Sequence, residues 1–156
     1  MTLDTGDALP SFDLPTDGGG RISRSSMLGN PWVLYLYPKD DTSGCTKEAI
    51  AFTDAKPEFD ALGVAVVGLS KDDVKAHDKF VAKHELGIRL ASDEEGKLVE
   101  ALGAWVEKSM YGKTYMGIDR STFLIDADGN IARAWRKVKV DGHVEEVLAA
   151  ARQLTA

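Results

Sequence analysis

The chain has 156 residues, of which 44% are hydrophobic and 28% charged, with a formal net charge of −6 at pH 7 and a single cysteine. This length and composition predict one globular domain over residues 1–156 that folds without disulfides or metals. The negative charge disfavours a nucleic-acid or anionic-membrane surface, since either would need a basic patch.

Residues 1–7 lack the basic region and apolar core of a signal peptide. No apolar run approaches the ~18 residues of a membrane span. A lone cysteine without an export signal is typical of a reducing compartment. We therefore expect a cytoplasmic protein that contacts neither membranes nor nucleic acid.

Short apolar runs bounded by glycine, proline and polar residues predict extended segments along the whole chain. These segments are residues 12–15, 21–23, 32–37, 64–69, 86–91, 121–125 and 131–135. The glycine-rich residues 16–20 predict the turn of a short N-terminal hairpin, and residues 126–130 predict the turn between the last two strands. The polar stretch 106–119, which contains two glycines, is expected to be a loop.

The first expected helix follows the central strand at residues 32–37. Thr42 or Ser43 is suited to cap it, because a short side-chain oxygen can accept from a free backbone N–H group. The helix is expected to end at residues 62–63 and to bend or restart at Pro57, which lacks a backbone donor.

The second expected helix opens with Ser70 and Asp73, a pair that resembles a capping box. Two more follow at residues 94–102 and 144–154, where apolar residues recur at helical spacing. The order is β-α-β-α-β-β-α, with βαβ crossovers first and an antiparallel pair afterwards. It predicts an α/β protein with a thioredoxin-like fold, in which a central mixed sheet is flanked by helices and extended by an N-terminal hairpin.

Cys45 lies where the first helix is expected to begin. Free backbone N–H groups and the positive end of the helix dipole stabilise a thiolate there, and the thiolate is the reactive form. The carboxylates of Asp40 and Asp41 oppose a second negative charge. A lone cysteine is often an inert, buried small hydrophobe, but the polar neighbours Gly44 and Thr46 favour a reactive site.

If Cys45 is activated despite the nearby carboxylates, a cation has to be supplied. Lys39 and Lys47 are near in the sequence but flexible. Arg120 stands at the start of the strand 121–125, where its guanidinium could hold a fixed fork of donors toward the sulfur. Arg120 is therefore the preferred candidate.

Three residues around the cysteine match a motif of proline, three residues, threonine, two residues and cysteine, namely Pro38, Thr42 and Cys45. With these residues the chain resembles the peroxiredoxins, most of all the bacterioferritin comigratory protein or peroxiredoxin Q branch. Arg120 matches the active-site arginine of that family. The resemblance covers nearly the whole chain, from about residue 6 to the last helix.

The resemblance implies an antioxidant peroxidase that reduces hydrogen peroxide and organic hydroperoxides. The Cys45 thiolate would attack one peroxide oxygen and become a sulfenic acid. Thr42 would contact the peroxide and the sulfur, and Pro38 would shield the sulfur from water. Arg120 would stabilise the thiolate and the leaving oxygen, together with the backbone N–H groups of Gly44 and Cys45.

The resemblance also indicates how this chain departs from its family. Ser43 stands where the family often has proline. Glu48 is not a departure, and the resemblance implies that it orients Arg120. Many members carry a resolving cysteine at positions that hold Ile50 and Val81 here. An internal disulfide is therefore impossible, and an external thiol must reduce the sulfenic acid, whether thioredoxin, a glutaredoxin system or a low-molecular-weight thiol.

No cofactor or metal is implied, and the branch suggests a monomer. His77 and His84 are seven residues apart on one predicted helix, too far to share a metal. Residues 126–130 resemble a calcium loop but lack its glycine offset and its final glutamate.

Two alternative functions for this chain would use the same fold. One is a redox-linked holdase chaperone or partner-binding module, and the other is a disulfide oxidoreductase, which needs a C-x-x-C pair that this chain lacks.

Overall fold

The computed structural model describes residues 3–156. Its strands are β1 Asp13–Pro15, β2 Arg21–Ser23, β3 Trp32–Leu36, β4 Ala65–Ser70, β5 Arg89–Ser92, β6 Trp105–Met110, β7 Lys113–Ile118, β8 Ser121–Ile125 and β9 Ile131–Trp135. Its α-helices are α1 Ser43–Ala61, α2 Val74–His84, α3 Lys97–Ala101 and α4 His143–Thr155. Short 3-10 turns, η1 Asp17–Gly19 and η2 Ser25–Met27, flank β2.

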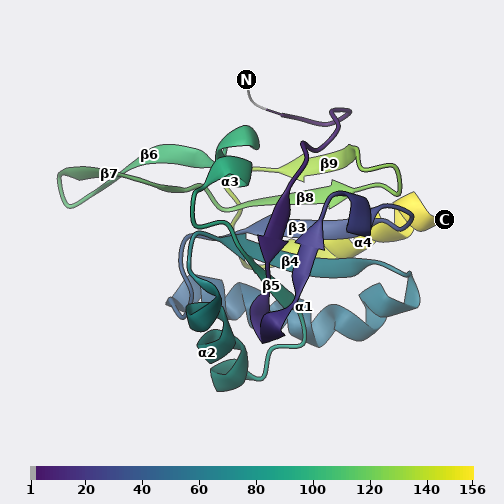
Figure 1. Cartoon of the computed structure of the whole chain (residues 1–156), viewed down its shortest axis with the longest axis horizontal. Helices are drawn as coiled ribbons and strands as arrows, with labels where there is room; N and C mark the ends of the chain where they lie inside the picture. The colour runs from purple at the N-terminus through teal and green to yellow at the C-terminus, as the bar shows by residue number, and fades with distance from the viewer. Residues whose placement is uncertain (1–2) are drawn as a thin grey trace.

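A five-stranded sheet with the order β5-β4-β3-β8-β9 forms the centre of the molecule (Figure 1). β3 pairs in parallel with β4 and antiparallel with β8, so the sheet is mixed. Because β3 and β4 are parallel, the chain must cross back between them, and α1 makes that crossover. The predicted central mixed sheet flanked by helices is confirmed.

Alternation along β3 divides the interior into two hydrophobic clusters. Val33 and Tyr35 point to the face covered by α1, α2 and α4, whereas Leu34 and Leu36 point to the face covered by α3 and the N-terminal segment. All four side chains are 0% exposed, as expected for a central strand buried on both faces. Cys45 belongs to the first cluster.

The predicted N-terminal hairpin is confirmed as β1 and β2, which pair antiparallel and lie across the sheet (Figure 1). Ile22 is 2% exposed and joins the cluster on the Leu34 side of the sheet. The carboxylate of Asp17 accepts a hydrogen bond of 2.7 Å from the backbone N–H of Leu90. The extension is therefore fastened to the β5 edge of the sheet.

The predicted restart of the first helix at Pro57 is wrong, because α1 is one element through that residue. Proline removes one intrahelical hydrogen bond. Phe52 and Phe59, on either side of it, are both 0% exposed in the core. Tertiary packing of this kind supplies most of the stability of protein helices and holds α1 together.

Ser70 does not cap α2, contrary to the prediction. It is the last residue of β4, and its buried hydroxyl donates to the carboxylate of Asp72 at 2.6 Å. The cap is Asp73, whose carboxylate accepts from the Ala76 N–H at 2.8 Å. The helix predicted at 94–102 is shorter and begins after Gly96, whose positive φ of 75° breaks the helical path.

The prediction of a loop at residues 106–119 is wrong, because β6 and β7 form an antiparallel hairpin there. The connection is Tyr111-Gly112, with φ values of 53° and 77°. Two successive positive φ values are typical of a two-residue type I′ turn. The hairpin projects from the body of the molecule (Figure 1), so neither face shows the apolar alternation that would predict strands.

Candidate functional site

Cys45 is the third residue of α1 and is 1% exposed. The helix begins after Thr42, whose carbonyl accepts the first intrahelical hydrogen bond, 2.8 Å from the N–H of Thr46. The N–H groups of Ser43, Gly44 and Cys45 precede that bond and have no intrahelical acceptor. They form a set of donors at the positive end of the α1 dipole, beside the sulfur.

Arg120 connects the sulfur to a buried carboxylate. Its Nη2 donates to Cys45 Sγ at 3.3 Å and its Nη1 donates to Glu48 Oε1 at 2.7 Å. A side chain at Gly44 would place a Cβ 3.2 Å from Nη2, so glycine leaves room for the guanidinium. The predicted residues Cys45, Gly44, Glu48 and Arg120 thus lie together, and Arg120 supplies the cation.

Burial and charge act in opposite directions on Glu48 and Arg120. The Glu48 side chain is 0% exposed, and this burial raises its pKa to about 7 even though Arg120 lowers it. Burial alone lowers the pKa of Arg120, but the negative charges of Glu48 and Cys45 outweigh it and the pKa is raised. Arg120 therefore remains a fixed positive charge next to the sulfur.

Tyr35, which the sequence did not single out, is buried in the same hydrophobic cluster as Cys45. Burial, followed by the charges of Glu48 and Cys45, raises its pKa well above the usual value. Its hydroxyl and Glu48 Oε2 are both buried without a hydrogen-bond partner among residues 3–156. The sequence signal for Tyr35 is a tyrosine within an otherwise apolar strand. Because a buried tyrosine hydroxyl usually finds a hydrogen-bond partner, such a tyrosine indicates a polar group nearby.

Thr42 and Pro38 lie in the exposed loop between β3 and α1. Thr42 is the N-cap residue of α1, but its side chain makes no cap hydrogen bond. Instead its hydroxyl donates to the carbonyl of Lys39 at 2.9 Å. That bond crosses the loop and fixes the hydroxyl of Thr42, which precedes Cys45 by three residues in the sequence.

The two carboxylates expected to oppose the thiolate are engaged by other groups. Asp40 Oδ2 lies 2.7 Å from His77 Nδ1. Asp41 accepts from Lys83 at 2.6 Å and lies 2.8 Å from His84. The hydrogen bond from Lys83, followed by that of His84, lowers the pKa of Asp41. Both acids therefore bind α2, and their charge is compensated by that helix.

The other cations considered from the sequence do not contact the sulfur. Lys47 forms an ion pair with Asp141. Lys108, which sequence analysis did not single out, is half-buried on β6, and its pKa is lowered by burial and then by the charge of Arg120. Within residues 3–156, Arg120 is the cationic side chain that donates to Cys45.

The positions where many peroxiredoxins carry a resolving cysteine hold apolar residues that differ in exposure. Ile50 is 39% exposed on α1. Val81 packs, partly buried, against the core of the α1 face. Cys45 is a free thiol, and neither position offers it a partner.

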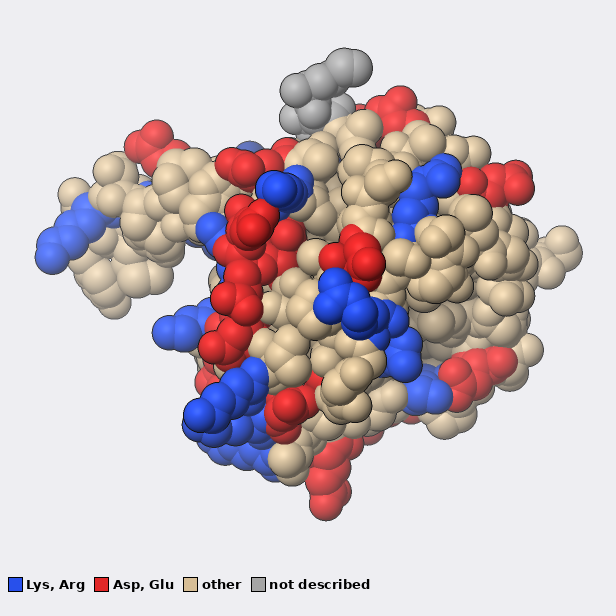
Figure 2. Space-filling view, viewed as in Figure 1, with Lys and Arg blue, Asp and Glu red and all other residues tan. Residues whose placement is uncertain are grey.

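Residues 3–156 contain no group of three or more histidine, cysteine, aspartate or glutamate side chains placed to hold a metal ion. None of the helices in that range has the length and apolar character of a membrane span. On the face drawn in Figure 2, acidic side chains form a band from α3 toward α2, with lysines gathered over α2. This face is not the continuous basic surface that nucleic acids require.

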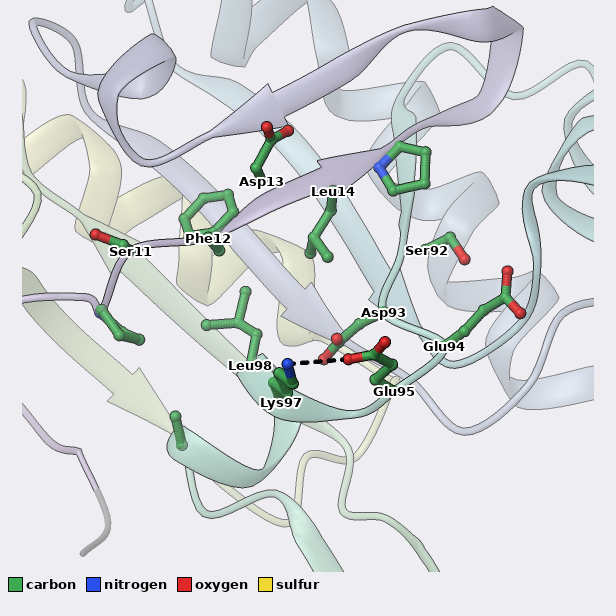
Figure 3. A pocket seen from close by; sticks show the side chains of 13 residues that line it. Ser11, Phe12, Asp13, Leu14, Ser92, Asp93, Glu94, Glu95, Lys97 and Leu98 are labelled. Atoms are coloured by element: carbon green, nitrogen blue, oxygen red, sulfur yellow. Dashed lines mark ion pairs between the residues drawn. The ribbon is translucent and has the colours of Figure 1, made fainter.

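A separate pocket of about 460 Å³ lies between the N-terminal hairpin and residues 92–101 (Figure 3). Phe12, Leu14 and Leu98 line its apolar part, and an ion pair of 3.1 Å between Lys97 and Glu95 crosses its edge. Its apolar residues belong to the cluster on the opposite face of the sheet from Cys45. The pocket is therefore not part of the sulfur site.

Comparison with known proteins identifies the family. The profile of the AhpC/TSA family matches residues 5–134. The putative peroxiredoxin bcp of Coxiella burnetii is 49% identical over 148 residues, which cover 95% of this chain and 98% of the relative.

Two solved structures resemble the chain closely. A mutant of Xylella fastidiosa PrxQ superposes with a TM-score of 0.93 at 38% identity and covers 98% of both chains. The Xanthomonas campestris bacterioferritin comigratory protein, studied for its alkyl peroxide reduction activity, gives a TM-score of 0.89 at 41% identity and covers 96% of this chain and 100% of its own.

The thioredoxin-like fold predicted from the sequence is confirmed, and so is the resemblance to the peroxiredoxin Q branch in a variant with one cysteine. These relatives support the peroxidase prediction and not the chaperone alternative. The chain belongs to the AhpC/TSA family of peroxiredoxins and is a thiol-dependent peroxidase of that family.

Proposed function

We propose that Cys45 reduces hydrogen peroxide and organic hydroperoxides through a sulfenic acid, with Arg120, Thr42 and Pro38 as the other catalytic residues. The observation that carries this proposal is the 3.3 Å hydrogen bond from Arg120 to Cys45 Sγ. A fixed guanidinium beside a sulfur favours the nucleophilic thiolate. The alkyl peroxide reduction studied in the Xanthomonas relative supports organic hydroperoxides as substrates.

In the first step the Cys45 thiolate attacks the nearer oxygen of the peroxide, and the O–O bond breaks. The sulfur gives up two electrons and becomes a sulfenic acid, while the departing oxygen takes a proton and leaves as water or alcohol. Arg120 and the free N–H groups of Gly44 and Cys45 stabilise the charge on the departing oxygen. The Thr42 hydroxyl contacts the peroxide and the sulfur, and Glu48 orients Arg120.

In the second step a thiol from outside the chain attacks the sulfenic sulfur and displaces water, forming a mixed disulfide. A second thiol then releases Cys45. The single cysteine supports this route, because Ile50 and Val81 cannot form a disulfide. The reductant is thioredoxin, a glutaredoxin system or a low-molecular-weight thiol, and assays of turnover with each purified candidate identify which.

We further propose that residues 1–156 form one peroxiredoxin domain that acts as a cytoplasmic monomer. Both hydrophobic clusters lie against the same five-stranded sheet, which supports a single domain. A lone cysteine that must stay reduced between turnovers supports a reducing compartment. Sedimentation equilibrium measures the oligomeric state.

Competition kinetics test the activity. Wild-type protein and a reference peroxidase compete for limiting hydrogen peroxide, and a sulfenic-acid trap is then followed by intact mass. We expect Cys45 to react far faster than free cysteine and the trap to label wild type and not Cys45→Ser. A rate no greater than that of free cysteine thiolate would overturn the proposal.

A further inference from the structure

His77 is 0% exposed, and both of its ring nitrogens face oxygen atoms. Nδ1 lies 2.7 Å from Asp40 Oδ2, and Nε2 lies 2.9 Å from the backbone carbonyl of Ala91. A carbonyl oxygen only accepts, so Nε2 must carry a hydrogen. The contact with a carboxylate then requires a second hydrogen between Nδ1 and Oδ2. The His77–Asp40 pair therefore holds one proton more than a neutral imidazole beside a free carboxylate.

Asp40 is fixed from two further directions. The hydroxyl of Tyr37, the residue after β3, donates to Asp40 Oδ1 at 2.5 Å. The backbone N–H of Asp40 donates to Asp72 Oδ2 at 2.8 Å, and Ser70 holds the same oxygen at 2.6 Å. The Asp40 side chain is 6% exposed. Asp40 is thus a buried anchor in an otherwise exposed loop.

The anchored residue lies between the two loop residues that the proposed mechanism uses, Pro38 and Thr42. The intervening Asp41 has a φ of 60°, a left-handed conformation that residues other than glycine adopt at an energetic cost. Such a conformation persists only where the surroundings hold it. The contacts of Asp40 fix the chain on one side of Asp41. The hydrogen bond accepted by the carbonyl of Thr42, the first acceptor of α1, fixes it on the other side.

We propose that His77 is a positioning residue for the peroxidase reaction. Through the proton that it shares with Asp40, His77 holds the loop 38–42 in its reactive conformation. The inference rests on the proposed function of Thr42 and Pro38. His77 touches neither the peroxide nor the sulfur, so its effect reaches Cys45 through the position of the loop. Losing the shared proton leaves the Nδ1 lone pair facing a carboxylate, which weakens the hold.

The ionisable groups around His77 come from several elements. Asp40 belongs to the loop, Asp72 to the segment before α2, and Tyr37 follows β3, while β5 presents only the carbonyl of Ala91. Burial lowers the pKa of His77, but the hydrogen bond and the charge of Asp40 outweigh it, and the pKa is raised above 6.5. The hold is therefore complete below pH 6.5 and is lost as the pH rises through the raised value.

The test compares His77→Gln and Asp40→Asn with Lys75→Gln, a surface change on the same helix. Rate constants for the reaction of Cys45 with hydrogen peroxide are measured by stopped flow from pH 6 to 9. At pH 7 we expect His77→Gln to be slower than wild type by about tenfold, since a displacement of about 1 Å can cost up to 100-fold. Lys75→Gln should match wild type throughout.

Asp40→Asn separates the effect of the extra proton on the His77–Asp40 pair from the effect of their hydrogen bond. An asparagine amide can donate to a neutral Nδ1, so this variant keeps the hydrogen bond without the extra proton. We expect it to keep most of the rate at pH 7. In wild type, imidazole nitrogen NMR shifts of His77 should show both nitrogens protonated at pH 7, and in Asp40→Asn only one.

Two results would overturn the inference. One is a wild-type rate for His77→Gln across the pH range, and the other is an imidazole with a single proton in wild-type protein at pH 6. Either result leaves the proposed function standing, provided that wild-type Cys45 still reacts fast and Thr42→Val slows it. A wild-type protein that does not react with peroxide removes both proposals together.

Discussion

The loop 38–42 with the first turn of α1 differs from the β6–β7 hairpin in how its side chains are held. Around Cys45, the side chains of Glu48 and Arg120 bind each other, and the side chain of Asp40 binds His77. On the hairpin, Tyr111 is 97% exposed, and the turn is fixed by its own backbone. Replacing a side chain is therefore expected to change chemistry in the first segment and little in the second.

Arg120→Met should have the largest effect of any single change outside Cys45. It removes the donor to the sulfur and the stabilisation of the leaving oxygen, and we expect the rate constant with hydrogen peroxide to fall by about 10³-fold. Stopped-flow kinetics measure it. Arg133→Met, a change at an exposed arginine over the Trp135 ring, is the matched control and should stay within about twofold. A loss within about twofold for Arg120→Met would mean that the site around Cys45 is no more sensitive than the surface.

Glu48→Gln should change how stability depends on pH. The pKa of Glu48 is raised from 4.5 to about 7, so the stability that its protonated form confers is complete below about pH 4.5 and is lost as pH rises through about 7. The free energy of unfolding of wild type should therefore fall, relative to Glu48→Gln, by about 3 kcal/mol between pH 4.5 and 8. Urea unfolding at each pH measures the difference. Glu58→Gln, at an exposed position on the same helix, should show no such trend, and a flat difference for Glu48→Gln would contradict the expected burial effect.

Thr42→Val tests the exposed side of the first segment. The hydroxyl donates its hydrogen to the Lys39 carbonyl, so it would accept from the O–H of the peroxide, and losing this oriented contact should lower the rate constant by about 10²-fold. Thr42→Ser keeps the hydroxyl and should retain most of the rate. Thr114→Val, at an exposed threonine of β7, is the control in the other segment. Equal rates for Thr42→Val and Thr42→Ser would show that the hydroxyl takes no part.

Tyr111→Asn should have the smallest effect. Asparagine followed by glycine suits two positive φ values better than tyrosine does, so stability should rise by no more than about 0.5 kcal/mol, the range of surface substitutions. Peroxidase rates should be unchanged. A tenfold loss of rate would instead place the tip of the hairpin in the reaction.

Local signals explain which features the sequence predicts. The apolar run before Cys45 predicts β3. Thr42 stands at the N-cap position of α1, but its side chain makes no cap hydrogen bond, so the predicted capping by that side chain is not found. The contact between Arg120 and Cys45 spans 75 residues, and it was predictable because Arg120 stands at the start of a predicted strand and matches the active-site arginine of the family. The partnership of Asp40 with His77 spans 37 residues and has no such signal.

The wrong predictions also have physical causes, which lie in contacts that are distant in the sequence or absent. Residues 106–119 mix polar and apolar side chains on both faces, with Met110, Tyr115 and Met116 exposed, because the hairpin projects from the core, so the usual alternation is absent. Asp40 and Asp41 were expected to act on the sulfur because they are its neighbours in sequence. In space they bind α2, since the chain reverses between β3 and α1.

The depth of the sulfur also determines the rate law of the catalytic cycle. Cys45 is 1% exposed, so we expect the thiol of a folded protein, a larger molecule than the peroxide, to be kept from Sγ while α1 stays folded. That larger molecule has to wait for the first turn of α1 to open, and such local openings are unimolecular. At high concentrations of a protein reductant, turnover should therefore saturate at the frequency of opening, and the ceiling on catalysis is a property of this chain and not of its reductant.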